Sequence, residues 1–196
     1  MAKSEIQKIR KELAKQLDSK RYEHTLGVAY TAAALAMRYD YDIMKAFEAG
    51  LLHDCAKCMT HEERLNYCKK NNLEVTEIEK KNPSLLHAKV GADLSNRKYG
   101  IIDEDICNAV RFHTTGRPDM TLLEKIIFIA DYLEPHRCEA EDLPIVRKQV
   151  FVDIDSALRT ILSDTLVFLE KSGNEIDPMT VKTYEYYIDL ERQVTG

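Results

Sequence analysis

The sequence predicts an all-α protein. Hydrophobic residues recur at helical spacing along nearly the whole chain, and no convincing run alternates with the period of two that a strand would show. Aspartate, threonine and glycine stand where helices would begin and end, which divides the pattern into helices joined by short turns. A chain of 196 residues, 44% of them hydrophobic, can bury one self-sufficient core. We therefore expect a single domain over residues 1–196, with its core at about 20–190.

Three helices are expected in the first part of the chain. Isoleucine and leucine at positions 6, 9, 13 and 17 form an apolar stripe along the first. The second, over about residues 20–38, places His24 and Leu35 on one apolar face, so His24 points inward. The third begins at Asp42, a favoured N-cap residue, and leads into the adjacent pair His53 and Asp54.

Two further helices are expected on either side of a stretch without a clear pattern. Thr60 and Glu63 have the spacing of a capping box and open a short, very polar helix. Residues 71–82 show no clear periodicity. A helix over residues 83–100 then begins with proline, ends at glycine and turns His87 toward the core.

The next two helices each present one ionisable residue on an apolar face. A helix over residues 103–116, capped by aspartate and ended by glycine, turns His113 inward. A second capping box at residues 121–124 opens a helix on which Asp131 is a neighbour of two apolar residues.

Two helices are expected in the C-terminal part. One long helix runs from Pro144, a favoured first helical residue, to Gly173. The last has Asp177 as its N-cap and Pro178 at its first position, and it turns Tyr187 inward.

Charge and composition limit the partners. The chain has 33 acidic and 28 basic side chains, a formal charge of -5, and neither sign forms a long block. Nucleic acids select basic faces, so we expect no nucleic-acid partner. No window has the roughly 18 apolar residues of a membrane span, and the start of the chain lacks the apolar region of a signal peptide. Five cysteines without framework spacing indicate reduced thiols and therefore a cytoplasmic protein. A homodimer is possible.

Six ionisable residues indicate a metal centre, because each lies on or at the end of the apolar face of an expected helix. They are His24, His53, Asp54, His87, His113 and Asp131. A carboxylate at a core position costs several kcal/mol unless a cation or hydrogen bonds compensate it. Imidazole and carboxylate without thiolate suit iron, manganese or zinc in an open, partly hydrated site. Six ligands exceed the need of one ion, so a two-metal centre bridged by Asp54 is one interpretation.

Other interpretations stay beside this one. A single inward histidine is more often a core residue than a ligand, and Asp131 could pair instead with Lys125 or Arg111. The run CAKC at residues 55–58, followed closely by a histidine and a further cysteine, could be a zinc knuckle or a redox pair. It lacks a second CxxC, whereas inward ionisable residues on five separate helices together favour the metal centre.

These residues resemble the pattern H…HD…D of the HD superfamily of metal-dependent phosphohydrolases, with His24, His53, Asp54 and Asp131 in the matching places. More specifically, the chain is similar to the YqeK-type symmetrical bis(5'-nucleosyl)-tetraphosphatases of bacteria over about residues 20–190. The matching blocks are RYEHTLGVA at 21–29, AGLLHDCAK at 49–57, LLHAKVGA at 85–92 and AVRFHTTGRPDMTLLEKIIFIADYLEPHR at 109–137. The last block is the most specific. One departure is Asp177, where the family would have a histidine before the proline.

The resemblance implies a helical HD-domain bundle that hydrolyses diadenosine tetraphosphate to two ADP through a metal-bound water, usually with iron. It implies that His24, His53, Asp54 and Asp131 hold the metal, and that His87 and His113 hold a second ion or contact phosphates. Catalytic roles would fall on Asp54, Lys57, His87, His113 and Asp131. The implied nucleotide contacts are Arg21, Asp54, Cys55, Ala56, Lys57, His87, His113, Thr114, Asp131, Arg137, Asn174, Glu175, Ile176, Asp177, Pro178 and Met179.

Electrostatics supports part of this assignment. A tetraphosphate brings about four negative charges to an acidic protein, so it needs metal ions together with local cations such as Arg21, Lys57 and Arg137. Arg21 precedes His24 by three residues and shares its helix face. Two other functions stay open, namely hydrolysis of other nucleotides and nucleotide binding by an HD module without catalysis. The intact ligand pattern argues against the second.

Overall fold

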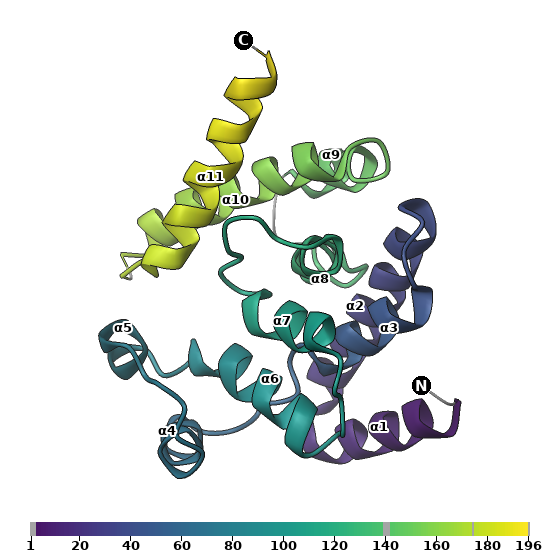
Figure 1. Ribbon diagram of the computed structural model, residues 1–196, viewed down its shortest axis with the longest axis vertical. Coiled ribbons are helices and arrows are strands. Elements are labelled where there is room, and N and C mark those ends of the chain that lie inside the picture. The colour runs from purple at the N-terminus through teal and green to yellow at the C-terminus, as the bar shows by residue number, and fades with distance from the viewer. Residues whose placement is uncertain (1–2, 139–141, 174, 196) are drawn as a thin grey trace.

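The chain folds into helices that pack around a central group formed by α2, α3, α7 and α8 (Figure 1). The computed structural model describes residues 3–138, 142–173 and 175–195, and these ranges contain eleven helices and no strand. The prediction of an all-α fold is confirmed. In chain order the helices are α1 (Lys3–Gln16), α2 (Ser19–Arg38), α3 (Ile43–Leu52), α4 (His61–Lys70), α5 (Glu77–Lys81), α6 (Leu86–Arg97), α7 (Glu104–Phe112), α8 (Leu122–Leu133), α9 (Leu143–Gln149), α10 (Ile154–Ser172) and α11 (Pro178–Thr195).

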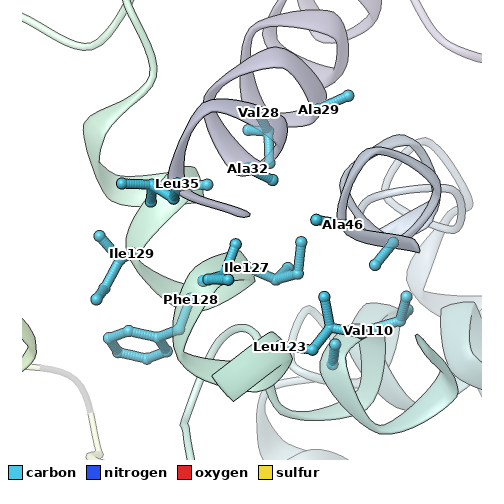
Figure 2. Packing of buried hydrophobic residues seen from close by; sticks show 14 of the residues in the cluster. Val28, Ala29, Ala32, Leu35, Ala46, Val110, Leu123, Ile127, Phe128 and Ile129 are labelled. Atoms are coloured by element: carbon cyan, nitrogen blue, oxygen red, sulfur yellow. The ribbon is translucent and has the colours of Figure 1, made fainter. Parts of the chain in front are cut away.

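The hydrophobic core lies where the four central helices meet. Figure 2 shows Val28 and Leu35 of α2, Ala46 of α3, Val110 of α7 and Ile127 of α8 gathered in the space between these helices. All five side chains are fully buried. The apolar faces read from the helical periodicity therefore meet in one core, and the ionisable residues on the same faces are carried inward with them.

Helices α2 and α3 cross very closely, because small residues line their contact. A Cβ atom added to Gly50 would lie 2.6 Å from the Cα atom of Ala29, so only glycine fits at that point of the crossing. This crossing places the N-terminal part of α2, with His24, against the end of α3, where His53 is the C-cap residue.

The helix starts follow the predicted caps. Asp42 accepts hydrogen bonds from two backbone N–H groups at the start of α3. Both predicted capping boxes form, at Thr60 and Glu63 before α4 and at Thr121 and Glu124 before α8. These are local interactions, which is why the sequence identifies them.

The prediction of one long helix over residues 144–173 is wrong. The chain forms α9 and α10 instead, and the break lies at Asp153, whose backbone is extended. The Asp153 carboxylate accepts hydrogen bonds from the backbone N–H groups of Asp155 (2.9 Å) and Ser156 (3.1 Å), so it begins a new helix rather than continuing the old one.

Two smaller differences concern the middle of the chain. Residues 71–82 contain the short helix α5, which opens with a third capping box, Thr76 and Glu79. Helix α6 begins at Leu86 rather than at Pro83, with a turn before it. Tyr187 of α11 is buried as expected. None of the helices in the described ranges combines the length and apolar character that crossing a bilayer requires.

Candidate metal centre

Three of the four site histidines are oriented by a backbone carbonyl three residues earlier. The pairs are His53 with Gly50 at 2.7 Å, His87 with Ser84 at 2.6 Å and His113 with Val110 at 2.7 Å, each measured from Nδ1 to the carbonyl oxygen. A carbonyl oxygen can only accept, so Nδ1 carries the proton and donates it. The Nε2 atom of each ring is then a lone-pair donor available to a metal ion.

The Nε2 atoms converge on one another. Those of His24 and His53 are 3.3 Å apart, and those of His87 and His113 are 3.2 Å apart. Burial lowers the pKa of His53 to about 4 and that of His87 to about 3, so both rings are neutral near pH 7. Neutral rings with their lone pairs turned inward are the form in which histidine binds metals.

Asp54 supplies a clear sign that a cation belongs here. Its Oδ1 atom is buried without a hydrogen-bond partner among the described residues, although the Lys57 ammonium group is 3.7 Å away. The nearest ring atoms are Nε2 of His87 at 3.3 Å and Nε2 of His113 at 3.5 Å, both of which are acceptors in the tautomer set by their backbone partners. An anionic oxygen that faces two acceptors in a buried site is compensated by a positive charge between them.

Two groups of side chains have metal-ligand geometry in the described part of the chain. One is His24, His53 and Asp131, and the other is His53, Asp54 and His113. Ligands of one ion stand about 2.8–3.6 Å apart when each is 2.0–2.2 Å from it at angles of 90–110°. His24 Nε2 lies 3.0 Å from Asp131 Oδ1 and 3.3 Å from His53 Nε2, while His53 to Asp131 is 3.9 Å. The first group therefore fits one ion with little adjustment.

The second group extends the site toward a further ion. His53 has one available nitrogen and can serve a single ion, whereas the carboxylate of Asp54 has two oxygens and can bridge. Asp54 Oδ2 lies 3.8 Å from His53 Nε2, and Oδ1 faces His87 and His113. This arrangement agrees with the predicted bridging role of Asp54, which stays a prediction.

The three predicted cations lie beside the two carboxylates. Arg21 Nη1 is 2.8 Å and Lys57 Nζ 3.7 Å from the Asp54 carboxylate, and Arg137 Nη2 is 3.2 Å from Asp131 Oδ1. Burial opposes ionisation of Asp54, but its neighbours hold the pKa of that carboxyl well below its usual range. The alternative pairing of Asp131 with Lys125 or Arg111 is not formed, because Lys125 binds Asp155 at 2.6 Å and Asp131 binds Arg137.

The cysteines are not part of the candidate metal centre in the described residues. Neither ligand group in the described residues contains a cysteine. Cys55 is buried and its Sγ atom points to the carbonyl of Gly91 at 3.6 Å, while burial raises the pKa of its thiol to about 12. Cys58 is exposed. Ala56 is fully buried in a small hydrophobic cluster, so the side chains of Cys55 and Ala56 serve packing.

One cavity borders the centre, and a second adjoins it at Thr114. The first, of about 690 Å³, is lined by His113, Thr114, Asp131 and Arg137, together with Phe168 and Lys171 of α10. The second, of about 390 Å³, lies between α5, α6, the end of α7 and the start of α11. Thr114 lines both, and its hydroxyl is 3.3 Å from Nε2 of His87 and of His113.

Part of the predicted nucleotide segment, at the start of α11, faces the smaller cavity. Asp177, Pro178 and Met179 line it, whereas the Glu175 carboxylate binds Lys81 at 2.7 Å. Ile176 is half-buried. Asn174 lies outside the described residues.

Sequence reasoning missed Glu134. This residue is buried, and its Oε1 atom lies 3.1 Å from Nδ1 of His24. Burial disfavours the charged form of His24, but the carboxylates of Asp131 and Glu134 outweigh it and raise the pKa of the ring. Glu134 follows Asp131 by three residues and so shares its side of the helix end, a signal that could have found it.

Comparison with known proteins identifies the family. A model described as HD domain matches residues 21–136, a span that holds all six candidate ligands. The chain belongs to the HD domain family. Its relatives in this family include the symmetrical bis(5'-nucleosyl)-tetraphosphatase of Bacillus subtilis, 42% identical over 88% of this chain and 92% of the relative. The protein of the same name from Staphylococcus aureus is 34% identical over 93% of this chain and 94% of the relative. The resemblance stated from the sequence is confirmed.

A solved HD domain structure has the same fold. It is a crystal structure from Clostridium acetobutylicum, described as a predicted HD superfamily hydrolase involved in NAD metabolism. Its sequence is 41% identical, its TM-score is 0.90, and the match covers 94% of this chain and 97% of that one. Membership of the HD domain family and the two histidine and aspartate groups together indicate a divalent metal ion.

Proposed function

We propose that this HD domain protein hydrolyses diadenosine tetraphosphate, and related dinucleoside tetraphosphates, symmetrically into two nucleoside diphosphates. The observation that carries the proposal is the buried histidine and aspartate centre, in which Oδ1 of Asp54 has no hydrogen-bond partner among the described residues, beside a cavity bordered by cations. It is supported by relatives 42% and 43% identical over most of the chain, which carry the name of this hydrolase.

His24, His53, Asp54 and Asp131 are proposed to hold the metal, with His87 and His113 completing a second position or contacting phosphate. We propose iron, which the resemblance to the tetraphosphatases implies; nitrogen and oxygen ligands without thiolate suit it, as they also suit manganese and zinc. When bound, such an ion lowers the pKa of a water molecule toward neutrality and polarises a phosphoryl oxygen.

The chain's own residues prepare the attack. Asp131 is 23% exposed and faces the larger cavity. Burial opposes ionisation of its carboxyl, but the neighbouring histidines hold the pKa of Asp131 well below its usual range, so it stays ionised. It can therefore accept a hydrogen bond from the attacking water and turn a lone pair toward phosphorus. Lys57 Nζ lies 2.9 Å from His87 Nε2, and its ammonium group is partly exposed beside the centre. We assign Lys57 to stabilising the charge that develops on the phosphoryl oxygens.

Binding of the tetraphosphate depends on the three cations. Arg21, Lys57 and Arg137 are 33%, 31% and 49% exposed, so each can reach substrate while it neutralises a carboxylate. The protein carries a formal charge of -5, so these local positive charges decide where the phosphate chain lies.

The two cavities support symmetric cleavage. Both volumes, 690 and 390 Å³, fall within the range of about 300–1,000 Å³ that ligand pockets occupy. Because Thr114 separates them beside the centre, one nucleoside in each cavity would lay the phosphate chain across the metal site. Attack at the middle of that chain divides four phosphates into two and two.

The test is product analysis with metal-replete protein prepared under reducing conditions. We expect ADP as the sole product from diadenosine tetraphosphate, and Asp54→Asn should lose both bound metal and turnover. Asp189→Asn, which changes a surface aspartate of α11 paired with Arg192, is the matched control and should leave both unchanged. Retained turnover in Asp54→Asn would end the proposal, and ATP with AMP as products would end its symmetric part.

A substrate panel separates the alternatives. Nucleoside mono- and triphosphates, cyclic nucleotides and NAD should be cleaved far more slowly than the dinucleoside tetraphosphate. Tight nucleotide binding without hydrolysis of any member would favour a binding module. The single domain, the cytoplasmic location, the absence of a nucleic-acid partner and the open question of a homodimer stay predictions of the sequence.

A further inference from the structure

Glu134 stands next to the metal centre and is almost completely buried. It is the C-cap residue of α8, and only 1% of its surface is exposed. Its Oε1 atom lies 3.1 Å from Nδ1 of His24. Its Oε2 atom accepts the backbone N–H of His136 at 2.8 Å and lies 3.0 Å from the ring nitrogen Nδ1 of the same residue.

His24 needs such a partner because of its place in the helix. His53 and His113 lie at the ends of their helices and His87 at the start of one, where the carbonyl three residues earlier can accept from the ring. His24 lies inside α2, where the carbonyls of the preceding turn already bond to the helix's own N–H groups. Its ring is therefore oriented by a side chain 110 residues away.

We propose that Glu134 is the positioning residue of this centre. Its carboxylate accepts the Nδ1–H of His24 and so keeps the Nε2 lone pair directed at the ion. This inference rests on the proposed role of His24 as a metal ligand. The same carboxylate also fixes the turn that follows α8, because it holds the backbone of His136, and Arg137 beside it contacts Asp131. One residue thus orients a ligand and the loop that brings a phosphate-binding cation.

Only a carboxylate meets both demands. The His136 backbone N–H and the His24 Nδ1–H are two donors, and each needs an acceptor oxygen. Glutamine has the same shape but one oxygen. If that oxygen turns to the backbone N–H, the amide NH₂ faces His24 and favours the tautomer with the proton on Nε2, where the metal would bind.

Gly27 provides independent support for this arrangement. It follows His24 by three residues, so it lies one turn further along the same side of α2. A Cβ atom on Gly27 would lie 2.5 Å from Oε2 of Glu134, so the absence of a side chain makes the space in which the carboxylate sits. Gly27→Ala should push the carboxylate away from His24 without changing its charge.

The experiment measures Mn²⁺ affinity of the full chain without nucleotide, by calorimetry, for wild type, Glu134→Gln and Gly27→Ala. We expect both variants to bind about 10- to 100-fold more weakly, the range seen when an outer partner of a metal-bound histidine is removed. Glu48→Gln is the matched control: it removes the same charge from another buried glutamate, on α3, and should keep wild-type affinity. Circular dichroism shows that each variant is folded.

Nitrogen NMR of the metal-free protein, at an alkaline pH where the ring is neutral, gives a second readout. The ring lies between two carboxylates, with Glu134 3.1 Å from Nδ1 and Asp131 3.0 Å from Nε2. The wild-type ring should hold the larger share of its proton on Nδ1, and Glu134→Gln should shift that proton toward Nε2. Unchanged Mn²⁺ affinity together with the Nδ1–H tautomer in Glu134→Gln would overturn the inference. Neither measurement uses the substrate, so a wild-type protein that binds metal but leaves diadenosine tetraphosphate intact would remove the proposed function alone.

Discussion

The close crossing of α2 and α3 predicts a strong effect for Gly50→Ala. A Cβ at this position would lie 2.6 Å from Cα and 3.0 Å from N of Ala29, and neither of these backbone atoms can rotate away. Carbon atoms pack best about 3.5–4.0 Å apart, so the two helices must separate by about 1 Å. The substitution acts where the helix carrying His24 meets the helix carrying His53.

Two opposing contributions set the change in stability. Alanine is favoured over glycine in a helix by about 1 kcal/mol. Overpacking a well-filled core costs about 1–3 kcal/mol, and the upper part of that range applies because the clash is with backbone. We expect the free energy of unfolding to fall by about 1–2 kcal/mol, the difference between these values.

The effect on the site should exceed the effect on stability. His24 and His53 present Nε2 atoms 3.3 Å apart, and metal sites hold their ligand distances to within about 0.2 Å. A displacement of about 1 Å between the helices should therefore weaken metal binding, and such a misplacement can lower turnover by about 100-fold.

Urea unfolding and metal calorimetry measure the two effects. Gly91→Ala in α6 is the matched control, because its Cβ would meet the side-chain atom Cγ1 of Val110 at 3.3 Å, which can move slightly. That variant should be about as stable as wild type and bind metal normally. If Gly50→Ala were as stable as Gly91→Ala and bound metal with wild-type affinity, the reasoning from the close crossing would be refuted.

Three further predictions concern stability. Burial raises the pKa of Glu48, and its Oε1 atom has no hydrogen-bond partner among the described residues, so Glu48→Gln should stabilise the protein by about 1–3 kcal/mol at pH 7–8. That gain should vanish below about pH 4, where the carboxyl is protonated in both states, and a gain independent of pH in urea titrations would contradict it. Tyr187→Phe leaves the buried backbone N–H of Met120 without its acceptor at 2.9 Å and should cost about 1–3 kcal/mol in thermal unfolding. Thr121→Ala removes the N-cap of α8 and should cost about 0.5–2 kcal/mol in urea; an unchanged midpoint would count against the cap.

The fold could be predicted where the deciding interactions are local. The caps at Asp42, Thr60 and Thr121 each bind backbone groups within three residues, so the sequence alone identifies them. The break at Asp153 is equally local, and its cap could have been recognised. The apolar periodicity continues across residues 144–173 and so favours one helix, against the cap at Asp153.

The candidate site could be predicted only in part. Periodicity puts His24, His87 and Asp131 on inward faces. As expected, the structure buries the histidine rings of the site near one another. Periodicity does not say which inward residues meet. The contact of Arg21 with Asp54 joins residues 33 positions apart, and it depends on how α2 crosses α3 rather than on either helix.

The four histidines differ in whether local or tertiary contacts determine the orientation of their rings. Three of them are held in the metal-binding tautomer by a backbone carbonyl three residues earlier, so a local interaction within one turn determines their orientation. The fourth, His24, takes its orientation from Glu134, which reaches it only because α2 and α8 pack together and Gly27 leaves room. Disturbing the packing of α2 should therefore weaken the centre through His24 first, while the other three rings keep their tautomer.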